Sequence, residues 1–318
     1  MRNRTGQIRP ENYFGEERDR LRQGYCDLQW SPNRLLQSLK NSMDFYIPGG
    51  DADIVAIREW TRDAFYPQFA QGLSGQRPLL YVHGYNIGFE KACLRARHFQ
   101  ENLGLAGRFL LFSWPSDGHI LNYPRDEADI SWSIPALEQV IRELMRAYPD
   151  GIDLVAHSMG NRGLVMALDR VAAQWQARPG QAKPVHNLVL IAADMDAAIA
   201  SQYLPRLSLL AHRITLYVSD NDRALIASRT LHGYPRLGEA GTHLPVLSGV
   251  EVIDVSQLSL ERISGHLYHL ANRYVINDLQ QLLQQDLGAT QRPHLQPDTQ
   301  TGHYRLLEMP PSSAGSAM

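Results

Sequence analysis

Ser158 is the residue whose surroundings point most directly to chemistry. It follows the apolar run 152–156 and precedes an amphipathic helical pattern. A serine at a sharp strand-to-helix turn takes a strained backbone conformation, and small residues must stand two places before and two places after it. Ala156 and Gly160 occupy those places, which gives the G-x-S-x-G pattern with Ala for the first Gly. The pattern predicts a nucleophilic serine raised above a sheet edge.

Two backbone N–H groups are predicted to hold an oxyanion beside this serine. One belongs to Met159, at the amino end of the helix, where the helix dipole favours negative charge. The other belongs to Tyr85, in the turn His-Gly-Tyr-Asn (83–86) that follows an earlier apolar strand. Gly84 allows close approach of this turn because it has no side chain.

A nucleophilic serine also needs a base and an acid that orients the base. His266 follows the last predicted strand, and Gly265 before it lets the loop fold back toward the sheet. Asp222 stands where the chain leaves another strand and turns into a helix, and it is the favoured acid. Asp220 and Asp194 are the alternatives, and each of the three also suits an ordinary helix cap.

The elements that position these residues are short apolar runs that alternate with helical patterns. Strands are predicted over 79–82, 109–112, 152–156, 188–192, 214–218 and 250–255. Such alternation predicts an α/β fold with a doubly wound, mostly parallel sheet and helices on both faces. Ligands of such sheets bind beyond the carboxyl ends of the strands. Because Ser158, Asp222 and His266 follow strands, all three are expected on one rim.

The sequence divides into three parts. Residues 1–75 are predicted to form an extension with a charged arm, a short strand at 44–47 and a helix at about 51–67. Residues 76–285 are predicted to form the α/β catalytic domain. Residues 286–318 are rich in Gln, Pro, Ser and Thr, and we expect a flexible tail there.

Composition narrows the class of protein. The 318 residues, 44% of them hydrophobic, are enough for one large core. A net charge of -2 without a dense basic run argues against a nucleic-acid surface, and Arg2, Arg4 and Arg9 are expected to belong to a solvated arm. Cys26 and Cys93 form no CxxC pair, which suits a reducing compartment. Without a signal sequence or a long apolar run, we expect a soluble cytoplasmic protein with no membrane span.

Five motifs, taken in order, resemble the bacterial α/β-hydrolase family known as DUF900. The resemblance covers about residues 79–283 and implies an α/β-hydrolase fold with Ser158, Asp222 and His266 as its triad. It also favours Asp222 over Asp220, because the family's acid precedes an Arg/Lys-Ala-Leu segment. The motifs are His-Gly-Tyr-Asn (83–86), Phe-Ser-Trp-Pro-Ser (112–116), Ala-His-Ser-Met-Gly-Asn-Arg (156–162), Ser-Asp-Asn-Asp-Arg-Ala-Leu (219–225) and Gly-His-Leu-Tyr (265–268).

The predicted reaction is hydrolysis of a small ester or acyl substrate through an acyl-enzyme. A serine peptidase or an acyltransferase on the same fold is an alternative, because a triad does not select the leaving group or the acceptor. A binding or scaffold protein that engages a protein partner through its arm or tail is another. No cofactor or metal is expected, since the histidines lack HExxH or Cys/His spacing.

Three aromatic residues are candidates to contact the substrate. Trp114 follows a strand directly, Tyr123 lies in the irregular stretch after it, and Tyr268 follows the predicted base. Trp132, in the same excursion of the chain, is a fourth candidate. Each of them also suits an ordinary core or rim position, so both interpretations stay open.

Overall fold

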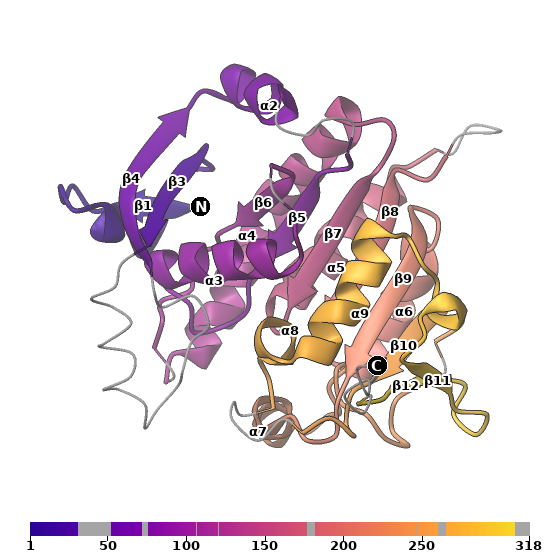
Figure 1. The fold of residues 1–318 in the computed structure, drawn as a ribbon. Helices are drawn as coiled ribbons and strands as arrows, with labels where there is room; N and C mark the ends of the chain where they lie inside the picture. Colours follow the sequence, from indigo (N-terminus) through magenta and orange to yellow (C-terminus); the bar gives the residue numbers. More distant parts are fainter. Residues whose placement is uncertain are drawn as a thin grey trace, which may run out of the picture.

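The computed structural model describes residues 1–30, 52–71, 76–105, 107–119, 121–176, 182–245, 247–259 and 265–308. These residues form an eight-stranded sheet flanked by helices, with a separate antiparallel ribbon beside it (Figure 1). The strand predicted at 44–47 lies outside the described residues.

The main sheet has the strand order β11-β12-β10-β9-β8-β7-β5-β6. All neighbours pair in parallel except β11 and β12. All six predicted strands are present as β5 to β10, and the predicted fold class is confirmed. The strand bounds are β5 Leu79–Val82, β6 Phe109–Phe112, β7 Ile152–His157, β8 Val185–Ile191, β9 Ala211–Val218, β10 Val250–Asp254, β11 Leu295–Pro297 and β12 Tyr304–Leu306.

Helices cover both faces of the sheet, as alternating strands and helices require. On one face, α4, α5 and α6 pack into one core cluster, and on the other face α3, α8 and α9 pack into a second (Figure 1). The remaining helix of the sheet region, α7, caps the rim after β9. The bounds are α3 Phe89–Asn102, α4 Tyr123–Ala147, α5 Gly160–Ala173, α6 Ala197–Leu207, α7 Arg223–His232, α8 Tyr268–Ala271 and α9 Arg273–Gln284.

The amino-terminal part is mostly extended. It contains β1 Arg2–Arg4, the 3-10 helix η1 Pro10–Asn12, β2 Phe14–Arg18 and β3 Gln23–Trp30. β3 pairs antiparallel with β4 Ala52–Trp60, and α2 Arg62–Gln71 follows. The helix predicted over 51–67 is therefore wrong for its first part. The β-branched residues of this segment favour a strand once a partner strand is available, and local periodicity does not reveal that partner.

The segment after α9 corrects the predicted tail. The 3-10 helix η2 Ala289–Gln291 is followed by β11 and β12, and β12 pairs with β10 at the edge of the main sheet. Arg292 is buried, and it donates to Asp278 over 2.6 Å and to Glu251 over 2.9 Å. This segment can be polar and still be ordered, because it lies at the edge of the sheet, is held by ion pairs and places few side chains in the core.

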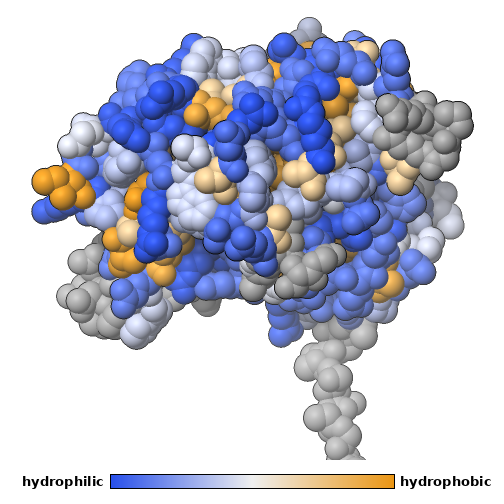
Figure 2. All heavy atoms as spheres, turned by 90° about the horizontal axis from the view of Figure 1, so that it is seen from above, coloured by the Kyte–Doolittle hydropathy of each residue, from blue (hydrophilic) through white to orange (hydrophobic). Residues whose placement is uncertain are grey.

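The surface is largely hydrophilic on the face shown in Figure 2, where apolar side chains gather only in small groups. Among the described residues, none of the helices combines the length and the apolar character that crossing a bilayer requires.

Candidate active site

Ser158 lies at the turn between β7 and α5, in the left-handed region at φ 53°. Such a conformation costs about 1–3 kcal/mol for a residue with a side chain, so the surroundings must impose it. They do so through the backbone: the Ser158 N–H donates to Ile191 O over 3.0 Å, and its carbonyl accepts from the Asp194 N–H over 3.2 Å. The Asn161 side chain donates to the same carbonyl over 2.9 Å. The strained turn predicted from sequence is present.

Two glycines allow β5 and its following turn to approach this serine. A Cβ on Gly160 would lie 2.5 Å from His83 O, and a Cβ on Gly84 would lie 2.8 Å from the Ser158 Cβ. Neither contact is tolerated by a real side chain. The small residue two places after the serine is therefore required by the end of β5, as the pattern predicts.

Asp222 and His266 meet at the carboxyl rim although they are far apart in sequence. Asp222 Oδ2 lies 2.7 Å from His266 Nδ1. The other oxygen, Oδ1, accepts from the N–H groups of Ala224 and Leu225, both at 3.1 Å, and so caps α7. The carboxylate thus caps a helix and orients an imidazole at the same time. Capping fixes the carboxylate rotamer, which in turn fixes the ring.

Gly265 explains how the loop that carries His266 reaches Asp222. It takes a φ of 66°, which glycine adopts without strain. A Cβ there would lie 2.4 Å from Asn221 O, so the loop packs directly on the backbone before the acid.

The pKa of His266 lies above its ordinary value of 6.5. Burial alone lowers it, but the charge of Asp222 and the hydrogen bond to it raise it further than burial lowers it. The environment therefore stabilises the imidazolium, which is the form that a general base takes after it accepts a proton.

His157 joins the two halves of the site, and sequence reasoning missed it. This histidine directly precedes Ser158, and its Nε2 lies 3.0 Å from the backbone oxygen of His266. The two rings lie 4.6 Å apart between centroids. Burial, and then the nearby His269 and His266, hold the pKa of His157 well below its ordinary value, so it is a neutral donor. Its position beside the serine was the available signal.

The other two candidate acids do not contact His266. Asp194 is buried, and its oxygens accept from Arg236 over 2.9 Å, from Ser228 over 2.6 Å and from Tyr123 over 2.6 Å. Asp220 is exposed, and its N–H donates to Ser256 over 2.9 Å. Asp194 therefore has a full set of structural partners, while Asp220 faces solvent.

The two predicted oxyanion donors lie in two turns, Met159 in the serine turn itself and Tyr85 in the turn after β5. Met159 is the N-cap of α5, where the first backbone N–H groups of a helix lack intrahelical partners. Tyr85 lies in the turn after β5, which is held by a buried carboxylate of α4. Asp126 accepts from the Asn86 N–H over 3.2 Å and from the Ser116 hydroxyl over 2.5 Å.

Arg2 corrects the prediction of a solvated arm. Its side chain is buried, and it donates to Ser113 Oγ over 2.9 Å, to Ser116 O over 2.8 Å and to Ile87 O over 2.7 Å. These acceptors belong to the loops after β6 and β5. An arginine near the start of the chain therefore ties the turn that contains Tyr85 to its neighbour.

The candidate substrate contacts differ in position. Trp114 is fully buried, with its indole N–H 2.8 Å from His83 O and its ring stacked on His83. Tyr268 is buried as well, and its hydroxyl donates to Tyr217 O over 3.2 Å. Tyr123 is half-buried, and its ring lies 5.1 Å from that of Tyr85. Trp114 and Tyr123 thus both lie beside the predicted oxyanion turn, and substrate contact stays a prediction for all three.

Trp132, the fourth aromatic candidate, lies on α4 with 37% of its surface exposed. The guanidinium of Arg18 lies over its ring at 5.5 Å from the centroid. Within the described ranges, no group of three His, Cys, Asp or Glu side chains is placed to hold a metal ion.

Residues 64–285 match the family described as "Alpha/beta hydrolase of unknown function (DUF900)". The uncharacterized protein alr1448 of Nostoc sp. is 24% identical over 197 residues, which is 51% of this chain and 51% of the relative. The chain thus spans about half the length of the curated relative that it matches.

Solved hydrolase structures align with much of the chain at low sequence identity. A predicted CIB-like hydrolase from Thermoplasma acidophilum is 13% identical with a TM-score of 0.36, covering 71% of this chain and 91% of that one. A dienelactone hydrolase from Anabaena variabilis is 16% identical with a TM-score of 0.36, covering 66% and 84%.

Proposed function

The chain belongs to the DUF900 family of alpha/beta hydrolases, and from this premise we propose that it is a serine hydrolase that cleaves carboxylic esters. The observation that carries the proposal is the contact of 2.7 Å between Asp222 and His266, on the same rim as a serine in a strained turn. A carboxylate that orients an imidazole beside a nucleophile is the arrangement that serine hydrolysis requires.

The proposed reaction has two halves. Ser158 Oγ attacks the ester carbonyl while His266 takes the hydroxyl proton, and the backbone N–H groups of Met159 and Tyr85 stabilise the oxyanion. The C–O bond to the leaving alcohol breaks, and His266 returns the proton to that alcohol. Water then attacks the acyl-serine with His266 as the base, which releases the carboxylic acid and restores the serine.

The two carboxylate oxygens of Asp222 give this mechanism its electrostatic basis. Because Oδ1 caps α7, the carboxylate is held with Oδ2 directed at His266 Nδ1. That hydrogen bond fixes the tautomer in which Nε2 is free to accept a proton. It also stabilises the imidazolium, consistent with the raised pKa of His266.

A fluorophosphonate probe tests whether Ser158 is an activated nucleophile. We expect a single adduct on Ser158 in the wild-type chain and none in Ser158→Ala. The matched control is Ser131→Ala, an exposed serine on α4 whose hydroxyl donates to Glu127 O, and it should label like the wild type. Folded wild-type protein that takes no adduct would contradict the proposed function and favour a scaffold role.

A substrate series tests the leaving group. We expect p-nitrophenyl esters of graded acyl length to be hydrolysed with burst kinetics, because the acyl-enzyme accumulates. Peptide p-nitroanilides should be cleaved far more slowly. Faster cleavage of the anilides than of the esters would contradict the proposed esterase activity and indicate a peptidase. Acyl transfer to an added alcohol in preference to water would indicate an acyltransferase.

A further inference from the structure

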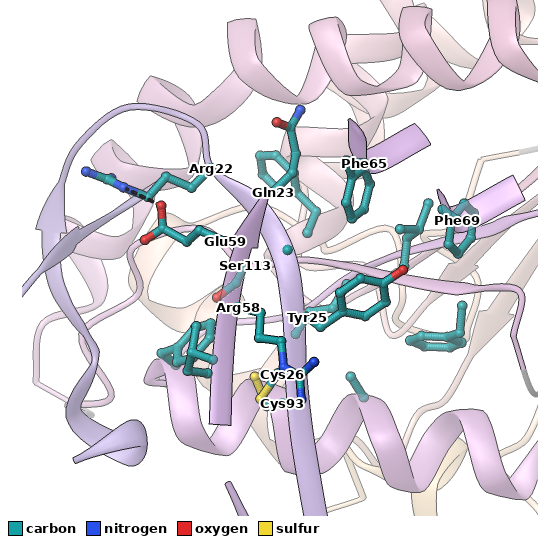
Figure 3. A pocket seen from close by; sticks show the side chains of 18 of the residues that line it. Arg22, Gln23, Tyr25, Cys26, Arg58, Glu59, Phe65, Phe69, Cys93 and Ser113 are labelled. Atoms are coloured by element: carbon teal, nitrogen blue, oxygen red, sulfur yellow. Dashed lines mark ion pairs between the residues drawn. The ribbon is translucent and has the colours of Figure 1, made fainter. Parts of the chain in front are cut away.

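A cavity of about 460 Å³ lies between the β3–β4 ribbon and the edge strand β6. Ligand pockets typically measure about 300–1,000 Å³, so this cavity is large enough for a small molecule. α2 and α3 close two of its sides, and Figure 3 shows Phe65, Phe69 and Tyr25 around it. The predicted catalytic and oxyanion residues do not line it.

The wall of this ribbon cavity is mainly apolar. Phe65 and Phe69 come from α2, Phe89 from α3, and Leu110 and Leu111 from β6. Aromatic and aliphatic side chains that face an open space leave apolar surface in contact with water, and covering it is favourable at about 25 cal/mol per Å². An apolar ligand would gain this free energy.

The charged groups of the cavity wall are unequal in sign. Among the described residues of the wall, Arg2, Arg22, Arg58 and Arg97 stand against one acidic residue, Glu59. Three of these arginines are already engaged: Arg2 donates to Ser113, Ser116 and Ile87, Arg22 pairs with Asp19 over 2.9 Å, and Arg97 pairs with Glu101 over 2.7 Å. Glu59 is already engaged, since it accepts from Arg4 over 2.6 Å and lies 3.5 Å from Arg22 (Figure 3). Arg58 lies 3.3 Å from Asp27 in a pair whose arginine side chain is 69% exposed, and water screens such pairs strongly. Arg58 is therefore the arginine of the wall that is most open to an incoming anion.

We propose that the ribbon cavity binds a single-chain amphiphile with an anionic head, such as a long-chain carboxylate. The alkyl chain lies among Phe65, Phe69, Leu110 and Leu111, and the head group pairs with Arg58 at the rim. The site is distinct from the catalytic rim, and the proposal does not depend on the proposed esterase activity.

Two cysteines supply a reporter within the cavity wall. Cys26 on β3 and Cys93 on α3 both line it, and their side chains lie next to each other (Figure 3). Burial, and then the neighbouring Cys26 thiol, hold the pKa of Cys93 well above its ordinary value, so it reacts slowly. Cys26 is only half-buried, so alkylation should report on it first. A ligand in the cavity should slow that reaction.

The test uses full-length Ser158→Ala protein, so that hydrolysis cannot interfere, and cis-parinaric acid, a fluorescent long-chain carboxylate. We expect saturable binding at one site and slower alkylation of Cys26 by iodoacetamide in its presence. Dodecanoate should displace the probe at a concentration about tenfold lower than dodecanol, because only the carboxylate pairs with the rim. Equal displacement by the alcohol would contradict the anionic head group.

Two variants locate the site. Ala96→Phe fills the cavity from α3 and should weaken binding at least about tenfold, whereas Ala198→Phe, on the exposed face of α6, should not. Arg58→Glu should weaken binding of the carboxylate by about tenfold and leave dodecanol unchanged. Its matched control is Arg206→Glu, which breaks the exposed pair between Arg206 and Asp169, 2.7 Å apart. Arg58→Glu decides the question if Ala96→Phe fails to fold.

Three results would overturn the proposal. They are the absence of binding to folded protein, binding that neither Ala96→Phe nor Arg58→Glu weakens, and binding that is lost when Ser158 of the wild type carries a fluorophosphonate adduct. The last result would assign the ligand to the catalytic rim. A wild-type chain that takes no adduct but binds the probe would contradict the esterase proposal alone.

Discussion

The two halves of the candidate active site are held together by different physical means. The Ser158 half lies at the end of an inner strand of the sheet, where backbone hydrogen bonds hold the turn and a Cβ on Gly160 would lie 2.5 Å from a neighbouring carbonyl oxygen. The half with Asp222 and His266 lies on loops after β9 and β10, and a side-chain contact joins it. A turn fixed by backbone packing tolerates almost no substitution, whereas a half fixed by side chains can be disabled without disturbing the fold.

Asp222→Asn is the change that separates these halves most sharply. Asparagine caps a helix about as well as aspartate, so we expect the free energy of unfolding to change by less than about 1 kcal/mol. It cannot orient and stabilise the imidazolium in the same way, and kcat for an ester should fall by about 10⁴-fold. Steady-state kinetics and urea denaturation measure the two quantities.

Asp196→Asn is the matched control for this variant. Asp196 is the N-cap of α6 and accepts from the Ile199 N–H over 3.0 Å, as Asp222 does for α7. It has no histidine partner in the described part of the chain, so activity should stay at the wild-type level. Loss of activity in both variants would mean that replacing a capping aspartate disturbs the rim in general, and it would contradict the specific role of Asp222 in orienting His266.

Gly265→Ala should displace His266 through a steric clash in the loop that precedes it. The added Cβ would lie 2.4 Å from Asn221 O, so the loop must move and carry His266 away from Asp222. We expect kcat to fall by about 100-fold, the scale of a displacement of about 1 Å at a catalytic group. Gly233→Ala is the control, since its φ of 78° is similar but nothing lies within 4 Å. Equal losses would point to backbone strain alone.

Arg2→Ala tests the support of the Ser158 half from outside the sheet. The change removes a buried charged donor from Ser113, Ser116 and Ile87, so we expect about 3 kcal/mol less stability and about tenfold lower kcat. Arg4 lies on the same strand as Arg2 and forms an exposed pair with Glu59 of β4. Arg4→Ala, which removes that pair, should leave kcat unchanged. Retained stability and activity in Arg2→Ala would show that the loops after β5 and β6 keep their conformation without Arg2.

The sequence predicts what depends on neighbouring residues. The turn at Ser158 and the strands β5 to β10 follow from local patterns, and so does the favoured position of Asp222 at the start of a helix. Arg2 could not be found in this way, because its acceptors lie up to 114 residues away. The strand β4 depends on its pairing with β3 across a segment outside the described residues. The ribbon cavity depends on how the ribbon, α2, α3 and β6 are spaced in the folded chain, and no local pattern encodes that spacing.

The smallest expected effect is a shift in the midpoint of the pH–activity profile. His266 must be neutral to accept the serine proton, so activity should rise as pH increases through its pKa. Burial lowers this pKa, but Asp222 raises it further, so the midpoint should lie above the ordinary value of 6.5. In Asp222→Asn the residual activity should rise at a lower pH. An activity profile flat between about pH 5 and 8 would contradict the role of His266, whose ordinary pKa lies in that range.

The pair between Asp222 and His266 should also make the free energy of unfolding depend on pH. Activity should rise with pH, whereas the stability that this pair contributes should fall with pH. Because the folded state raises the pKa of His266, the pair stabilises the protonated form. Its contribution to the free energy of unfolding is complete below the unfolded-state pKa and is lost as pH rises through the folded-state pKa. Urea denaturation of wild type and Asp222→Asn across this range should show the difference between them shrink toward high pH. A difference that stays constant or grows with pH would contradict this contribution of the pair between Asp222 and His266.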